Sequence, residues 1–133
     1  MDMSVFEVSR KRAGSAPVQA GLILGSGLGH LTAAVKGTAI PYSNLPGFPQ
    51  PGVSGHNAEL VIGELEGVRV AVFGGRAHYY EHCKPEAMRL PLGTLKALGA
   101  DRLILTNAAG SFRSDIPTGD LLLLSDHINF SGL

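Results

Sequence analysis

Short apolar runs along the chain alternate with polar stretches that are rich in glycine. Apolar runs that predict β-strands occupy residues 18–24, 59–65, 68–73, 102–105 and 120–124. Glu66 and Gly67 separate the second and third of these runs, which indicates a β-hairpin. Helices are predicted at 30–35 and at 85–98, where apolar residues recur at helical spacing before Gly99. This alternation of strands and helices predicts an α/β fold with a largely buried sheet.

Three of the predicted strands each lead into a polar loop that is rich in small residues. The loops are GSGLG at 25–29, GGRAHYYEH at 74–82 and TNAAGS at 106–111. Ligands of open α/β sheets bind at the carboxyl ends of the strands, so parallel neighbours would bring these loops to one place. A further stretch, residues 41–55, holds four prolines and three glycines and is expected to be a long functional loop. The sequence therefore predicts a ligand site where the three loops meet.

The composition narrows the classes of ligand that the protein binds. Its 133 residues include 11 basic and 11 acidic residues, and a neutral chain disfavours nucleic-acid or membrane-surface binding, which need an excess of positive charge. A neutral net charge does not argue against a single local anion-binding pocket. Residues 1–17 are expected to be a polar N-terminal arm rather than a secretory signal, and no apolar run approaches the ~20 residues that span a bilayer. The single cysteine, Cys83, excludes an internal disulfide and is typical of a reducing cytoplasm.

The GSGLG loop lacks both common nucleotide-binding signatures. His30 stands where a G-x-G-x-x-G fingerprint needs its third glycine, and the loop has no G-K-[ST] ending of a P-loop. What remains is a glycine turn that carries a hydroxyl, Ser26, before a predicted helix. It is either an anion site, which uses free N–H groups and the helix dipole, or a plain strand-to-helix turn. The TNAAGS loop is likewise either a place where a ligand touches main-chain N–H groups or a tight packing corner.

The nine residues of GGRAHYYEH allow a metal site, an anion site or a solvated polar loop. His78, Glu81 and His82 fit the zinc motif H-x-x-E-H, but that motif needs a helix that places both histidines on one face. The preceding Gly-Gly pair and a following proline disfavour such a helix, so no metal is expected. As an anion site, Arg76 offers a planar set of donors suited to phosphate. His78 and then Tyr80 follow at spacings of two along an extended segment.

Taken in order, five motifs resemble those of the trimeric purine nucleoside phosphorylases. They are GSGLG, GHNAEL, GGRAHYYEH, LTNAAGS and DHINF, and the likeness extends from about residue 21 to residue 133. The methylthioadenosine phosphorylases share part of this set, while NAAG and DHIN favour the purine nucleoside group. The resemblance implies a three-layer α/β/α fold with a central mixed sheet. Residues 18–133 would be the N-terminal portion of that domain.

The resemblance also implies roles for individual residues. The phosphate-binding residues would be Ser26, His56, Arg76, Ala77, His78 and Ala108. His78 would also be catalytic, together with Glu81, which would orient it, and Tyr80 would face the ribose. His56 would approach the phosphate from a flexible loop, although spacing alone equally allows an exposed histidine. No metal or other cofactor is implied, because inorganic phosphate is itself a substrate.

The implied reaction is phosphorolysis of purine (deoxy)ribonucleosides to the free base and (deoxy)ribose 1-phosphate, by a cytoplasmic homotrimer of full-length chains. A fixed phosphate dianion would both stabilise and attack the oxocarbenium-like sugar. His82 and Ser111 depart from residues that are common in the family. Family members are also considerably longer, so the base-recognising segment is expected to follow residue 133, and this chain alone is expected to lack turnover. The alternative function is that of a truncated relative that binds anions or nucleotides without catalysis.

Overall fold

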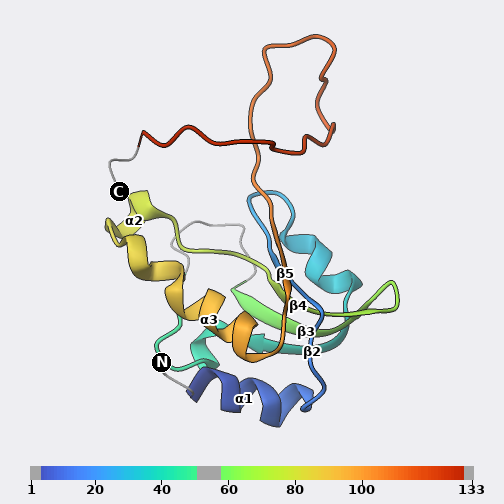
Figure 1. Cartoon of the computed structure of the whole chain (residues 1–133), viewed down its shortest axis with the longest axis vertical. Helices are drawn as coiled ribbons and strands as arrows, with labels where there is room; N and C mark the ends of the chain where they lie inside the picture. The colour runs from blue at the N-terminus through green and yellow to red at the C-terminus, as the bar shows by residue number, and fades with distance from the viewer. Residues whose placement is uncertain (1–3, 51–57, 131–133) are drawn as a thin grey trace.

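The computed structural model describes residues 4–50 and 58–130, and its centre is a five-stranded sheet (Figure 1). The strands are β1 (Ala20–Ile23), β2 (Lys36–Pro41), β3 (Glu59–Leu65), β4 (Val68–Phe73) and β5 (Arg102–Leu105). The helices are α1 (Ser4–Ala13), α2 (Tyr79–His82) and α3 (Arg89–Ala97), with the 3₁₀ helices η1 (Gly29–Ala34), η2 (Tyr42–Asn44) and η3 (Pro85–Met88). Within the two described ranges, every helix is too short or too polar to cross a membrane.

The sheet is mixed, as the resemblance implied, and its strands lie in the order β2-β3-β4-β1-β5. β1 is parallel to both β4 and β5, whereas β3 is antiparallel to both β2 and β4. The β3–β4 hairpin pairs Leu65 with Val68, and its turn residues Glu66 and Gly67 have φ of 48° and 77°. Positive φ at both positions gives the tight turn whose twist matches that of the flanking strands. The predicted hairpin is therefore confirmed.

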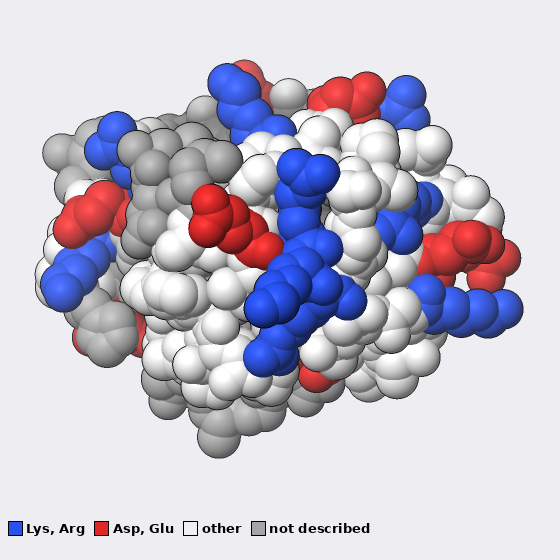
Figure 2. All heavy atoms as spheres, turned by 90° about the horizontal axis from the view of Figure 1, so that it is seen from below, with Lys and Arg blue, Asp and Glu red and all other residues white. Residues whose placement is uncertain are grey.

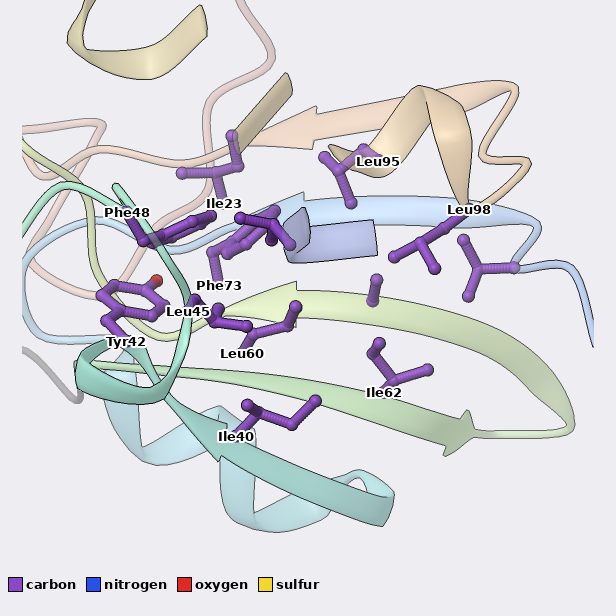
Figure 3. Close-up of a cluster of buried hydrophobic side chains, with 13 residues drawn as sticks. Ile23, Ile40, Tyr42, Leu45, Phe48, Leu60, Ile62, Phe73, Leu95 and Leu98 are labelled. Atoms are coloured by element: carbon purple, nitrogen blue, oxygen red, sulfur yellow. The ribbon is translucent and has the colours of Figure 1, made fainter. Parts of the chain in front are cut away.

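Alternate residues of the strands fill two cores on opposite faces of the sheet. The larger core lies on the face that α1 and α3 cover, and Figure 3 labels Ile23, Ile40, Tyr42, Leu45, Phe48, Leu60, Ile62, Phe73, Leu95 and Leu98 in it. The smaller core, beside η1, contains Leu24, Val35, Val61, Val70 and Val72. Helical segments therefore pack on both faces of the sheet, which confirms the three-layer arrangement. Burial is complete only in the middle, because the edge strands β2 and β5 are largely exposed.

The N-terminal segment, expected only as a polar arm, contains helix α1 packed against the larger core. Val5 and Ser9 are buried, and the Ser9 hydroxyl donates to the Val5 carbonyl at 2.8 Å. Arg69 of β4 fastens the end of the helix, since its guanidinium donates to the carbonyls of Ala13 at 2.6 Å and Ala16 at 3.2 Å. The periodicity of α1 is weak because its polar face is wide, which explains why the helix was not predicted.

The last turn of α1 is basic and carries Arg10, Lys11 and Arg12. Positive charge is favourable there because the free carbonyl groups give the end of a helix partial negative charge. Figure 2 views the molecule from the side on which α1 lies in Figure 1, and basic side chains gather near the middle of this face with acidic ones beside them. The face is thus of mixed charge rather than the continuous basic stripe typical of nucleic-acid binding.

The sequence missed one strand and predicted another wrongly. Residues 36–40, for which no element was predicted, form β2 together with Pro41, which was expected to begin a loop and is tolerated because β2 is an edge strand. Residues 120–124 do not form a strand, and Leu121 and Leu123 are 94% and 99% exposed. This apolar run pairs with no strand among the described residues, so it lacks both the ladder and the buried face that stabilise a strand.

Candidate functional site

The loops that follow β4, β1 and β5 meet at the carboxyl ends of these three parallel strands, as the pattern predicted (Figure 1). We call them the β4 loop (residues 74–78), the β1 loop (residues 25–28) and the β5 loop (residues 106–111). Two main-chain hydrogen bonds continue the sheet into this edge. Leu24 donates to the Phe73 carbonyl at 2.9 Å, and Thr106 donates to the Ile23 carbonyl at 3.1 Å. The three loops therefore start from adjacent points.

The β1 loop approaches the β5 loop so closely that its first residue must be glycine. Gly25 is buried, and a Cβ added there would lie 2.5 Å from the carbonyl oxygen of Thr106. The Gly25 N–H donates to the Thr106 hydroxyl at 2.8 Å, and Ser26 is exposed on the turn that follows. Because η1 is a 3₁₀ helix of six residues, the donors of this loop are a hydroxyl and main-chain N–H groups rather than a long helix dipole.

The β4 loop presents Arg76, and two separate hydrogen bonds hold this loop in place. Arg76 Nη1 donates to the Thr106 carbonyl at 2.8 Å. A guanidinium has five N–H donors. Within the described parts of the chain, this bond is the one that the Arg76 guanidinium makes, so its other N–H groups are available to an anion. The main chain is held at Gly75, whose carbonyl accepts a hydrogen bond of 2.7 Å from the Tyr42 hydroxyl. Arg76 is therefore half-buried and restrained before any ligand binds.

Tyr42 lies in the core beneath the β4 loop and keeps its proton. Its ring packs against Phe48 and Phe73, with centroid separations of 4.7 Å and 6.2 Å. Burial raises the pKa of the Tyr42 hydroxyl far above its ordinary value of 10.0. The hydrogen bond to the Gly75 carbonyl exists only while the hydroxyl is protonated, and the nearby Glu59 carboxylate raises this pKa further. The hydroxyl is therefore a dependable donor to Gly75 at physiological pH.

The β4 loop continues into α2, where His78, Tyr80 and Glu81 are brought together. His78 precedes the helical turn in an extended conformation, with φ −99° and ψ 145°. Glu81 Oε1 accepts a hydrogen bond of 2.9 Å from the His78 N–H, so this carboxylate orients the histidine through its main chain. The His78 ring stacks on that of Tyr80, with centroids 4.9 Å apart and an interplanar angle of 13°. Tyr80 is 71% exposed, so its hydroxyl lies where a solvent-borne ligand can reach it.

The H-x-x-E-H pattern falls on a single helical turn that starts too late for a zinc site. The sequence argued against a helix that carries both histidines on one face, and α2 covers only residues 79–82 before Cys83, whose φ is 51°. His78 is the residue before the turn and lacks helical geometry, so the spacing does not have the i, i+4 meaning that zinc proteases require. Within residues 4–50 and 58–130, no group of three or more His, Cys, Asp or Glu side chains is arranged to hold a metal ion.

The remaining predicted residues lie in different surroundings. Ala77 is buried in the β4 loop, and Ala108 is exposed in the β5 loop, where its main-chain N–H could serve a ligand. His56 lies outside the described residues. Sequence reasoning missed two residues that hold the loops, Thr106 and Tyr42. Thr106 carried a detectable signal, as the first residue after a predicted strand, whereas Tyr42 was hidden in a segment expected to be a loop.

Comparison with known proteins shows extensive similarity to one family. The model of the Phosphorylase superfamily matches residues 19–133. Purine nucleoside phosphorylase 1 of Geobacillus stearothermophilus is 49% identical over 115 residues, which are 86% of this chain and 42% of that protein. The purine nucleoside phosphorylase of Rattus norvegicus is 41% identical over 115 residues, which are 86% of this chain and 40% of that protein. The chain thus spans about two-fifths of the length of the curated relatives it matches.

Solved structures show the same similarity in three dimensions. A purine nucleoside phosphorylase in complex with ribose 1-phosphate matches with a TM-score of 0.75 and 39% identity, over 88% of this chain and 43% of the other. The Schistosoma mansoni enzyme in complex with inosine matches with a TM-score of 0.73 and 38% identity, over 87% of this chain and 40% of the other. These matches confirm the fold.

Proposed function

Because the chain belongs to the phosphorylase superfamily, we propose that it forms the phosphate site and part of the ribose site of a purine nucleoside phosphorylase. The observation that carries the proposal is the junction at Thr106, to which Gly25 of the β1 loop and Arg76 of the β4 loop are both hydrogen-bonded. A restrained guanidinium beside loops of small residues suits a phosphate dianion, which needs several donors from different directions.

Within this site the residues have the following proposed roles. Phosphate is bound by Ser26, His56, Arg76, Ala77, His78 and Ala108. Arg76 supplies the positive charge, and the loops supply hydroxyl and main-chain donors. His78 donates to the phosphate, and Glu81 keeps it in place through the hydrogen bond to its N–H. Tyr80, stacked on His78 and exposed, faces the ribose.

The proposed reaction needs no nucleophilic side chain. A phosphate oxygen forms a bond to C1′ of the nucleoside while the bond from C1′ to the purine nitrogen breaks. The electron pair of that bond leaves with the base, which takes up a proton, and the sugar departs as its 1-phosphate. Positive charge that develops on the sugar lies next to the bound phosphate dianion, so donors that fix the phosphate also stabilise the transition state.

Purine nucleoside and inorganic phosphate are the proposed substrates. Similar enzymes have been solved with ribose 1-phosphate and with inosine, which are the product and the nucleoside of such a reaction. The chain covers about two-fifths of its curated relatives, so we assign it the phosphate-binding half of the site and leave recognition of the base to residues outside the match.

Calorimetric titration of the 133-residue chain with inorganic phosphate tests the binding half of the proposal. Wild type should bind phosphate, and Arg76→Ala should weaken binding by about tenfold or more, because a charge-assisted hydrogen bond is lost. Arg102→Ala is the matched control, since Arg102 is an exposed arginine whose ion pair with Asp101 is 3.8 Å long. Absence of phosphate binding by wild type, or equal losses in the two variants, would contradict the proposal.

A chimera tests the catalytic half. Residues 19–133, which the family model matches, would replace the corresponding segment of the Geobacillus stearothermophilus relative, which is 49% identical to this chain over 115 residues. The chimera should release hypoxanthine from inosine only when phosphate is present, and Arg76→Ala in the chimera should abolish that release. A folded chimera that binds inosine but shows no phosphate-dependent cleavage would argue against the proposed role of this segment.

A further inference from the structure

Thr106, the first residue of the β5 loop, is hydrogen-bonded to the end of β1, to the β1 loop and to the β4 loop. Its N–H donates to the Ile23 carbonyl at the end of β1 at 3.1 Å. Its hydroxyl accepts a hydrogen bond of 2.8 Å from the Gly25 N–H. The same hydroxyl donates a long hydrogen bond of 3.5 Å to the Ile23 carbonyl. Its carbonyl accepts from Arg76 Nη1 at 2.8 Å. One residue therefore links the end of β1, the β1 loop and the β4 loop to the β5 loop.

The junction has little room to adjust. A Cβ at Gly25 would lie 2.5 Å from the Thr106 carbonyl oxygen, so the two backbones are already as close as a glycine allows. Gly25 is buried, and a buried N–H that loses its acceptor is costly. Threonine suits the position because its branched side chain restricts χ1 and holds the hydroxyl in one direction.

We propose that Thr106 is a positioning residue of the phosphate site, which aligns Arg76 and the Gly25–Ser26 turn without touching the substrate. This inference rests on the proposed function. The hydroxyl sets where the β1 loop sits, and the carbonyl sets the direction of the guanidinium. Since both act through one residue, a displacement of Thr106 moves a cationic donor and a neutral donor together.

Side-chain variants test the role of the hydroxyl. Thr106→Val keeps the shape but removes the acceptor, and it should weaken phosphate binding by about tenfold, the order expected when one buried N–H loses its partner. Thr106→Ser restores the hydroxyl and should bind phosphate within about twofold of wild type, because only a methyl group is lost. Thr94→Val is the matched control. Thr94 is a buried threonine of α3 whose hydroxyl donates to the Leu90 carbonyl at 2.9 Å. This hydrogen bond lies within α3 and not in the site loops, so removal of the Thr94 hydroxyl should leave phosphate affinity unchanged.

A double-mutant cycle separates positioning from general destabilisation. Ser26 belongs to the turn that Thr106 places, so Ser26→Ala should cost less phosphate affinity in the Thr106→Val background than in wild type. In the Thr94→Val background, Ser26→Ala should cost the same as in wild type. Thermal unfolding monitored by circular dichroism accompanies each titration. A role confined to folding stability predicts additive losses of affinity in both backgrounds.

The outcomes distinguish the two proposals. If wild type binds no phosphate, the proposed function is overturned. If wild type binds phosphate and Thr106→Val binds it as tightly as Thr94→Val does, the positioning role is overturned while the phosphate site stands. Should Thr106→Val fail to fold, Thr106→Ala replaces it, because the smaller side chain leaves space beside the Gly25 N–H. Thr106→Ala should then show the same loss, and wild-type affinity in that variant would overturn the positioning role.

Discussion

The Tyr42 hydroxyl donates a hydrogen bond of 2.7 Å to the carbonyl of Gly75, the residue directly before Arg76. Figure 3 shows Tyr42 within the larger core, beside Phe48 and close to Phe73 at the end of β4. The ring is 1% exposed, so its position is determined by packing rather than by solvent. A side chain fixed in the core therefore restrains the loop that carries the proposed phosphate-binding arginine.

Replacement of Tyr42 by phenylalanine should cost both stability and phosphate affinity. The Gly75 carbonyl is left buried without this donor, which costs about 1–3 kcal/mol of the free energy of unfolding. Urea denaturation measures the loss, and calorimetric titration measures the weaker binding of phosphate. Tyr79→Phe is the control, because Tyr79 is exposed and loss of its hydroxyl should change the free energy of unfolding by less than about 0.5 kcal/mol. Equal effects of the two substitutions would contradict the assigned role of Tyr42.

The raised pKa of Tyr42 predicts a loss of stability in alkaline solution. Its pKa in the folded protein lies above the ordinary value of 10.0 that applies to the unfolded chain. The unfolded state therefore releases this proton first, so the contribution of Tyr42 to stability is complete below pH 10 and decreases as the pH rises beyond it. Urea midpoints measured from pH 9 to 11.5 should fall more steeply for wild type than for Tyr42→Phe. Parallel curves for the two proteins would exclude a raised pKa at this position.

Substitution of Gly25 by alanine should disrupt the junction of the β1 and β5 loops. The new Cβ would lie 2.5 Å from the Thr106 carbonyl oxygen, which is main chain and cannot rotate away, so one loop must shift at a cost of about 1–3 kcal/mol. Phosphate binding should decrease at the same time. Gly110→Ala is the matched control in the β5 loop, because nothing lies within 4 Å of a Cβ built there. Similar unfolding midpoints for the two variants would show that the contact is relieved without cost.

Glu81 should act on His78 as a hydrogen-bond acceptor rather than as a charge. Its Oε1 accepts from the His78 N–H at 2.9 Å, and an amide oxygen can replace a carboxylate oxygen in this contact. Glu81→Gln should therefore retain most of the phosphate affinity, and Glu81→Ala should lose about 0.5–2 kcal/mol of the stability of the turn and bind phosphate more weakly. If Glu81→Gln binds phosphate as weakly as Glu81→Ala, the negative charge itself is required.

The parts of the fold that the sequence predicted well are those whose side chains fall into clear local patterns. β3 and β4 have the predicted bounds because their apolar runs flank a Glu-Gly turn, and β5 also has its predicted bounds. β2 was missed because four of its six residues are small or polar and only Ile40 is buried. The run at 120–124 was overpredicted because an apolar sequence indicates burial but does not supply the strand that would pair with it.

The site was predictable to the level of its loops but not of its contacts. Ser26, Arg76 and His78 were selected because each follows a predicted strand at the carboxyl end, where ligands bind, and their roles stay predictions. Tyr42 and Thr106 were not found, since their roles depend on contacts with residues 33 and 81 positions away in the chain. Such long-range hydrogen bonds leave no periodic trace in a sequence, and a threonine or tyrosine has many ordinary structural uses.

The exposed edge of the sheet predicts self-association of the 133-residue chain. Within residues 4–50 and 58–130, β5 pairs with β1 on one side only, and its Leu103, Ile104 and Leu105 are 45%, 51% and 60% exposed. An apolar edge strand with unpaired main-chain groups tends to pair with another chain. Sedimentation velocity should therefore show concentration-dependent association, and Ile104→Lys should reduce it because a charge on an edge strand opposes pairing. Val68→Lys is the control, since Val68 is an exposed apolar residue at the start of β4, and equal reduction by both variants would place the contact elsewhere.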